Sequence, residues 1–131
     1  MGVDANSHVQ VTPGVLSEYY AYLRDNAKET ARIHTQEVYA NMPIIKDIDS
    51  KISSLYRDMA LKRGQNLNSQ LEKLQQDKKI LLADGGYSEN YMDINYKCER
   101  CKDNGITDDG RQCDCLKLRQ KEAALWIKKK Q

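Results

Sequence analysis

Residues 96–116, YKCERCKDNGITDDGRQCDCL, contain all four cysteines of the 131-residue chain. Cys98 and Cys101 form a Cys-x-x-Cys pair, and Cys113 and Cys115 form a Cys-x-Cys pair after eleven intervening residues. Four thiolates complete the closed tetrahedral coordination of a structural zinc ion and leave no open position for a substrate water. The spacing therefore predicts a structural Zn²⁺ site with these four cysteines as ligands.

The residues between the two pairs favour the same site. Gly105 can take the positive-φ conformation that a tight turn beside a metal often requires. Asp108-Asp109-Gly110 reads as the tip of a β-hairpin, with Asp-Gly as the usual two-residue signal. Such a hairpin brings the second cysteine pair back toward the first. Basic residues surround the cluster and can neutralise a charge of about −2 on a zinc tetrathiolate, so they need not indicate nucleic-acid binding. They are Lys97, Arg100, Lys102, Arg111 and Lys117.

Disulfides and free buried thiols are the alternatives to a metal site. The first ten residues, MGVDANSHVQ, lack the apolar run of a secretory signal, and no later segment approaches membrane-spanning length. We therefore expect a cytoplasmic protein, in which paired cysteines favour a metal over disulfides. The short Cys-x-Cys loop leaves open whether both of its cysteines bind the ion. A histidine ligand would have to come from His8 or His34, and His34 lies at a core-type helical position that favours a packed or half-exposed ring.

Composition limits the size of the core. The chain has no Phe, one Trp, eight Tyr and 31% charged residues, which is typical of amphipathic helices and not of a thick sheet-based core. A formal net charge of +2 does not indicate a general polyanion binder. Positive charge is concentrated in residues 116–131, where Lys128, Lys129 and Lys130 are candidates for weak contacts with single-stranded DNA.

Three helices are expected before the cysteines. Thr12-Pro13 reads as an N-cap followed by proline at the first helical position, and apolar spacing continues to residue 41. Pro43 should end this helix and open the next. The apolar residues of the second and third helices recur at steps of three and four. They are Ile45, Ile48, Ile52, Leu55 and Met59 in the second helix, and Leu67, Leu71, Leu74 and Leu81, with Lys78 on the same stripe, in the third.

Short connections between these helices require antiparallel neighbours. We expect Gly64 to cap the second helix and Gly85-Gly86 to stop the third. The predicted fold is mainly α: an antiparallel helical hairpin or bundle of about three helices, then a small four-cysteine zinc module and a C-terminal linker helix. The expected divisions are a disordered N-terminus at 1–11, the helical bundle at 12–86, and the zinc module with its linker helix at 87–131.

The first helix is expected to be longer than its partners, so its start should overhang them. Tyr19, Tyr20 and Leu23 lie in that part, and amphipathic aromatic residues are enriched at protein interfaces. These residues are therefore candidates for partner binding. The sequence has no phosphate-binding loop, nucleophile–base pair or carboxylate dyad, so we do not expect this chain to be an enzyme.

Several segments resemble the N-terminal region of bacterial replicative-helicase loaders, the DnaI/DnaC-like proteins of the IstB-type AAA+ ATPase group. The similarity covers about residues 15–127 and is most specific in the cysteine module, YKCERCKDNG at 96–105 and CDCL at 113–116. It also includes Leu81-Leu82, Gly86-Tyr87, Tyr91-Met92 and the run PIIKDID at 43–49. Family members commonly have Thr at the position of Asn104, and some replace a cysteine ligand by histidine.

This resemblance implies a helicase-interaction domain, normally followed by an AAA+ domain that binds ATP and single-stranded DNA. We expect the ATPase domain to be absent here and the chain to act as an adaptor that helps place a DnaB-type hexameric helicase on DNA at replication initiation. Two other classes stay open. A zinc-ribbon nucleic-acid module would show salt-sensitive DNA binding, and a redox-switched thiol protein would use Cys113 and Cys115 reversibly.

Overall fold

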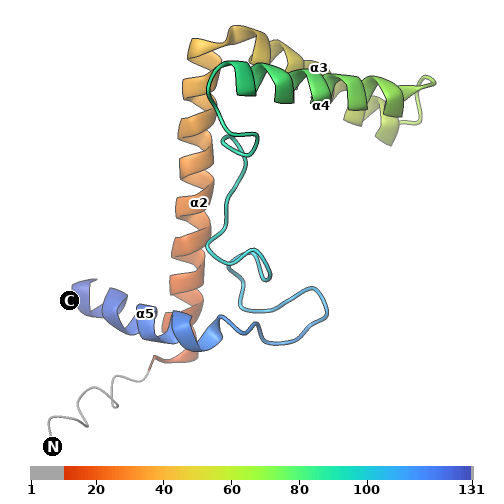
Figure 1. Cartoon of the computed structure of the whole chain (residues 1–131). Helices are drawn as coiled ribbons and strands as arrows, with labels where there is room; N and C mark the ends of the chain where they lie inside the picture. Colours follow the sequence, from red (N-terminus) through yellow and green to blue (C-terminus); the bar gives the residue numbers. More distant parts are fainter. Residues whose placement is uncertain (1–10, 131) are drawn as a thin grey trace, which may run out of the picture. The chain divides into compact units, whose positions relative to one another are not determined.

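The computed structural model describes residues 11–130 and is mainly helical (Figure 1). Its elements are α2 (Pro13–Asn41), α3 (Pro43–Ala60), α4 (Leu67–Asp84) and α5 (Leu116–Lys130). The pairing of Ile106 with Gln112 is the only β-bridge within residues 11–130. The predicted fold class, a helical region with a small cysteine module, is confirmed. The expected disordered segment 1–11 lies almost wholly outside the described residues.

The start of α2 follows the sequence signals. The backbone N–H of Val15 donates a hydrogen bond to Thr12 Oγ1 at 3.1 Å, so Thr12 caps one of the N–H groups that lack a partner inside the helix. Pro13 takes the first helical position, where its missing N–H costs nothing. At the other end of α2, Met42 leaves the helical conformation immediately before Pro43, which opens α3. The expected limits of the first helix, residues 14–41, are therefore confirmed to within one residue.

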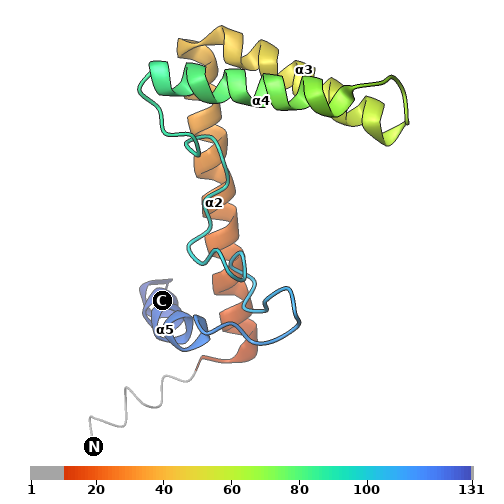
Figure 2. The same ribbon diagram turned by 45° about the vertical axis from the view of Figure 1, so that its right-hand side comes forward.

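Helices α3 and α4 form an antiparallel hairpin and lie side by side in both ribbon views (Figures 1 and 2). Ile48 and Leu55 of α3 and Leu71 of α4 are buried, which confirms the predicted seams. Lys78, on the same stripe of α4, is half-buried and its Nζ lies 2.7 Å from Asp49 Oδ1 on α3. That ion pair explains how a lysine is accommodated on a stripe of leucines.

The two ends of the hairpin use the same type of helix cap with different residues. After α4, Tyr87 N–H donates to the Leu82 carbonyl at 2.9 Å, with Gly86 at φ +85°. This is a Schellman motif with glycine in the left-handed position, as expected. After α3, Arg63 N–H donates to the Asp58 carbonyl at 2.8 Å, and Lys62 takes the left-handed position at φ +56°.

The prediction that Gly64 caps α3 is therefore wrong. Gly64 has a positive φ of +78°, but it lies in the loop two residues beyond the cap. The Schellman hydrogen bonds place Lys62, and not the nearest glycine, in the left-handed position. A lysine consequently occupies a backbone conformation that costs a non-glycine residue about 1–2 kcal/mol.

The described part of the chain forms two compact units, residues 11–30 with 94–130, and residues 31–93. The core of the second unit contains Val38, Ile45 and Leu82, which are 0 to 2% exposed. Met42 and Tyr87 pack against this core. The division predicted from the sequence, at residue 86, follows the order of the chain. The two units of the structure follow contacts in space, and α2 contributes to both.

Candidate metal centre

A short hairpin brings the two cysteine pairs together. Thr107 N–H donates to the Arg111 carbonyl at 2.8 Å, and Gly110 N–H donates back to the Thr107 carbonyl at 2.9 Å. The predicted hairpin tip at 108–110 is thus confirmed, but its loop is not a two-residue Asp-Gly turn. Such a turn needs positive φ at both central residues, whereas in this loop only Gly110 has one, at +82°. The loop is a three-residue connection whose last residue is glycine.

Gly105 closes the link between the pairs. Its carbonyl accepts the backbone N–H of Cys113 at 2.8 Å, and its φ of +81° confirms the conformation predicted for it. A Cβ at this position would lie 2.9 Å from Cε2 of Tyr20 on α2. Glycine is therefore needed here both for the backbone conformation and for the close approach of the aromatic ring.

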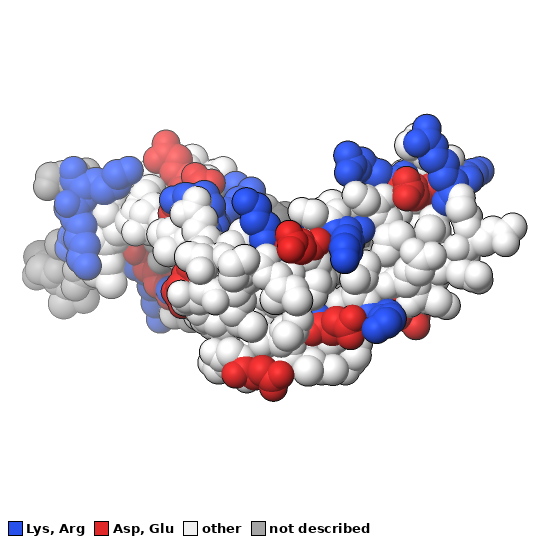
Figure 3. All heavy atoms as spheres, turned by 90° about the horizontal axis from the view of Figure 1, so that it is seen from above, with Lys and Arg blue, Asp and Glu red and all other residues white. Residues whose placement is uncertain are grey.

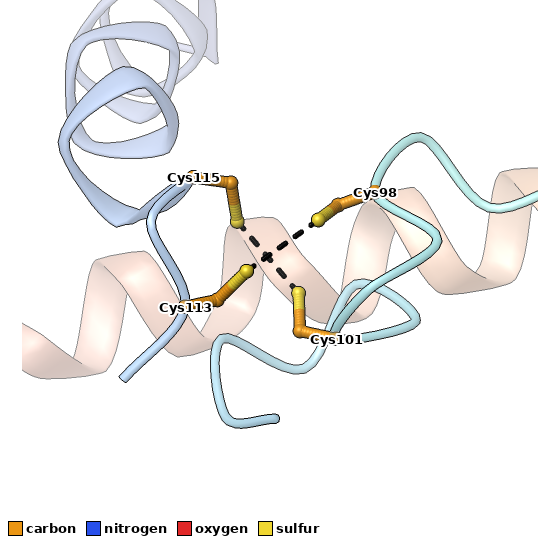
Figure 4. A group of neighbouring side chains, drawn as sticks. All are labelled: Cys98, Cys101, Cys113 and Cys115. Carbon is orange, nitrogen blue, oxygen red and sulfur yellow. Dashed lines mark hydrogen bonds between the residues drawn. The ribbon is translucent and has the colours of Figure 1, made fainter. Parts of the chain in front are cut away.

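The four sulfurs converge on one point (Figure 4). All four lie within 4.8 Å of one another, with Cys98 Sγ 3.6 Å from Cys113 Sγ and Cys101 Sγ 3.7 Å from Cys115 Sγ. A disulfide would require about 2.05 Å, and the cysteines are free. Four sulfurs at about 2.3 Å from a central ion stand about 3.8 Å apart in a tetrahedron. The cluster therefore has the size and the donor set of a tetrahedral metal site.

Backbone N–H groups organise the first pair around a buried carboxylate. Asp103 is fully buried, and its two oxygens accept the N–H groups of Lys97 at 2.9 Å and Cys98 at 2.8 Å. The N–H of Cys101 is hydrogen-bonded to Cys98. Asp103 itself has a φ of +56°, a region that Asp tolerates better than most residues. This carboxylate thus holds the Cys-x-x-Cys turn in the shape that points both sulfurs inward.

Side chains of helix α2 pack against the cysteine cluster. Tyr20, only 4% exposed, packs with Cys101 and Cys113, and its hydroxyl lies 3.2 Å from Cys115 Sγ. Burial and the hydrogen bond to Cys115 raise the pKa of Tyr20, so the phenol keeps its proton and is able to donate it to a Cys115 thiolate. Leu16 and Leu116 complete the apolar surround. A buried hydrogen-bond donor from another helix is typical of the outer ligand shell of a metal site.

The thiols differ in how readily they lose a proton. Burial raises the pKa of Cys98, but hydrogen bonds from the Cys101 backbone and from neighbouring thiols outweigh it and lower the value to about 7. Burial raises the pKa of Cys115 to about 12, although the Tyr20 hydrogen bond acts in the opposite direction. A divalent ion binding here must displace protons, as thiolate ligands always require.

The residues predicted to bind a partner were expected to be exposed, but they are buried or half-buried. Tyr19 and Tyr20 are 6% and 4% exposed and Leu23 is half-buried, so the expectation of an exposed overhang is wrong for this end of α2. The cysteine module and α5 cover this end of α2. The helical periodicity of α2 could not predict that contact, because it comes from distant parts of the chain. Tyr19 packs with Tyr22 and Trp126 at ring-centroid distances of 6.1 and 5.4 Å, and Tyr22 remains 43% exposed.

The basic end of α5 is exposed as expected. Lys128, Lys129 and Lys130 form its last turn, and Lys130 Nζ lies 4.3 Å from the centroid of the Trp126 ring. On the face shown in Figure 3, basic and acidic side chains are interspersed. Positive charge on α5 is therefore local, and one of its three terminal lysines also interacts with an aromatic ring.

His34 does not join the four-cysteine cluster. His34 is half-buried, its ring stacks on Tyr91 at 3.9 Å, and its Nδ1 donates to the Tyr91 carbonyl at 2.8 Å. This confirms the interpretation of His34 as a packed histidine. His8 lies outside the described residues.

Sequence reasoning missed three groups of the site: the Asp103 carboxylate, the Tyr20 hydroxyl and Arg119. Arg119 is buried at the start of α5, and its backbone N–H donates to the Cys115 carbonyl at 2.9 Å. Asp103 carried a usable signal, because an acidic residue two positions after a Cys-x-x-Cys pair can accept the N–H groups of the turn. Arg119 and Tyr20 carried none, because their importance depends on α5 and α2 meeting the cluster.

Comparison with protein-family models, curated proteins and solved structures returned no match. The fold and the site thus define a mainly helical chain with a four-cysteine cluster able to hold a metal ion. Among the described residues, no helix is both long and apolar enough to cross a bilayer.

Proposed function

We propose that this chain is the helicase-interaction module of a replicative-helicase loader. Its helices bind a DnaB-type hexameric helicase, and a structural zinc ion stabilises the cysteine module that leads toward the ATPase part of such a loader. The observation that supports this most is the convergence of Cys98, Cys101, Cys113 and Cys115, because these cysteines are the most specific part of the resemblance to the loaders.

Zinc is the proposed ion because a closed set of four thiolates suits its tetrahedral preference and leaves no open coordination position. Iron is the main competitor for a tetrahedral sulfur site. Metal analysis of protein purified without oxygen should give one zinc per chain and a colourless sample. Well under one zinc per chain, or stoichiometric iron, would overturn this part of the proposal.

The α3–α4 hairpin is the proposed helicase contact. Tyr56 on α3 and Ile80 on α4 are 51% and 50% exposed, although both are large apolar residues. An open groove between the two helices has Leu55 and Leu74 in its lining, and Lys51 is among its polar lining residues. Apolar grooves with polar rims bind amphipathic helices of partner proteins. Tyr56 and Ile80 do not line this groove, so the hairpin offers both exposed apolar side chains and a groove. The hairpin, and not the buried start of α2, is therefore the proposed contact.

A pull-down with the replicative helicase of the same organism tests the contact. The double variant Tyr56→Ala with Ile80→Ala removes exposed apolar area from the hairpin and should weaken binding about tenfold or more, since interface anchors typically contribute 1–4 kcal/mol. The matched control is Leu118→Ala with Leu125→Ala on α5, where the side chains are 54% and 64% exposed. Equal binding by wild type and the hairpin variant, or a loss only in the α5 variant, would contradict the proposal.

The adaptor proposal also requires that the chain does not hydrolyse ATP and binds single-stranded DNA only weakly. Any DNA affinity should come from the lysines of α5 and fall steeply with salt. Nucleotide hydrolysis that survives repurification would contradict the proposal. Sub-micromolar DNA binding that persists at high salt would favour the nucleic-acid module instead.

A further inference from the structure

One buried cation next to the cysteine cluster, Arg119, has a hydrogen-bond donor that is not satisfied within the described part of the fold. Arg119 lies in the first turn of α5 and is 5% exposed, and its backbone N–H donates to the Cys115 carbonyl at 2.9 Å. Its Nε is buried and has no hydrogen-bond acceptor among the described residues. A buried N–H group without an acceptor is unfavourable and uncommon in native structures, so this one needs an explanation.

The single carboxylate paired with Arg119 is shared with other donors. Glu122 accepts from Arg119 Nη1 at 3.1 Å through both oxygens, from the Tyr19 hydroxyl at 2.9 Å, and from Lys97 Nζ at 3.1 Å. Burial acts to raise the pKa of Glu122, but these donors outweigh it and the pKa is lowered, so Glu122 carries one negative charge. Glu122 therefore forms ion pairs with both Lys97 and Arg119, and Arg119 is the more deeply buried of these two cations.

The balance of charge changes when the cluster binds a divalent ion. With protonated thiols, the carboxylates of Asp103 and Glu122 are matched by Arg119 and Lys97, and Arg24 adds a cation whose Nη1 donates to the Asp103 carbonyl at 2.8 Å. Four thiolates around one divalent ion add about two negative charges to this region. Arg119 is the buried one of these cations, and the hydrogen bond from its backbone N–H to the Cys115 carbonyl places it next to the cluster.

We propose that Arg119 is the counter-cation of the loaded metal centre: its guanidinium offsets the charge of the metal-bound thiolates and raises the affinity of the cluster for a divalent ion. This inference rests on the zinc centre proposed above. Arg119 acts as a positioning residue and is not a ligand. Arg119 is in place before the ion arrives, so the tetrathiolate forms without a large reorganisation of charge.

Zinc affinity, measured by competition with a chromogenic chelator, tests the role of Arg119. Arg119→Met keeps the unbranched stem of the side chain and removes its charged guanidinium, and it should weaken zinc binding by about 10- to 100-fold, the usual range for an outer-shell partner. Arg119→Lys restores the charge and should recover most of the affinity. Lys121→Met is the control, because it removes an exposed cation from the same helix and should leave zinc affinity within about twofold of wild type.

A second measurement separates this role from a purely structural one. Arg119→Met should lower the urea midpoint of zinc-loaded protein more than that of chelator-treated protein, because only the loss of the ion pair with Glu122 affects both forms. Equal zinc affinity in wild type and Arg119→Met, or an equal loss in Lys121→Met, overturns the inference and leaves the zinc site standing. So does a variant that is equally destabilised with and without zinc. If the wild type binds no zinc, the proposed zinc centre fails and the inference fails with it.

Discussion

Removing one hydroxyl group tests how α2 supports the metal centre. The Tyr20 hydroxyl lies 3.2 Å from Cys115 Sγ, and the ring beneath it is 4% exposed. Tyr20→Phe deletes this donor and keeps the ring, its packing against Gly105 and the net charge of the protein. Any change in zinc affinity therefore reports the hydrogen bond to the sulfur.

The expected size follows from the charge on the acceptor. A hydrogen bond to a charged group contributes about 1.5–3 kcal/mol and a neutral one about 0.5–1.5 kcal/mol. If the module stays folded without zinc, only the difference, about 1 kcal/mol, appears in zinc binding. If the module unfolds without zinc, the full charged bond is lost. Since 1.4 kcal/mol corresponds to a factor of ten, zinc should bind about 5- to 140-fold more weakly.

Tyr19→Phe is the matched control for this assay. Tyr19 is equally buried and its hydroxyl also donates a hydrogen bond, but to Glu122 Oε1 and not to a sulfur. Chelator competition should show weaker zinc binding for Tyr20→Phe and nearly unchanged binding for Tyr19→Phe. Two variants with the same affinity as wild type, or with equal losses, would refute the assignment of the Tyr20 hydroxyl to the sulfur.

Three further predictions concern the helical unit and its independence from the metal. Leu82→Ala should lower the free energy of unfolding by about 2–5 kcal/mol in urea titration, because Leu82 is 2% exposed, whereas Ile80→Ala on the exposed face should change it little; similar losses in both would contradict the described core. Lys62→Gly should raise the urea midpoint and stabilise the protein by about 1 kcal/mol, because glycine accepts the φ of +56° without strain, and an unchanged or lower midpoint would count against the Schellman cap. Replacing Cys98 and Cys101 by Ser should abolish metal binding yet leave far-ultraviolet circular dichroism largely helical, since the α3–α4 seam contains no metal ligand; complete loss of helicity would show that the helices depend on the ion.

Much of the local structure was predictable because its causes are local. Thr12, Pro13 and Pro43 act on neighbouring backbone groups, so the limits of α2 and the start of α3 follow from a few residues. The seams of α3 and α4 follow from helical periodicity. Gly86 marks the end of α4 for a similarly local reason. The prediction for the cap of α3 was wrong because Lys62 takes the left-handed backbone conformation, which is usually taken by glycine.

The same distinction applies to the metal centre. Residue type and spacing alone determined that Cys98, Cys101, Cys113 and Cys115 form a four-sulfur cluster, because thiolate chemistry and a short hairpin leave few other arrangements. Only the tertiary structure decided which residues surround it. Contacts between α2, the loop and α5 join residues about 80 to 100 positions apart, and no periodic pattern encodes such contacts. For that reason Tyr20 changed from an expected interface residue to a buried donor beside a sulfur.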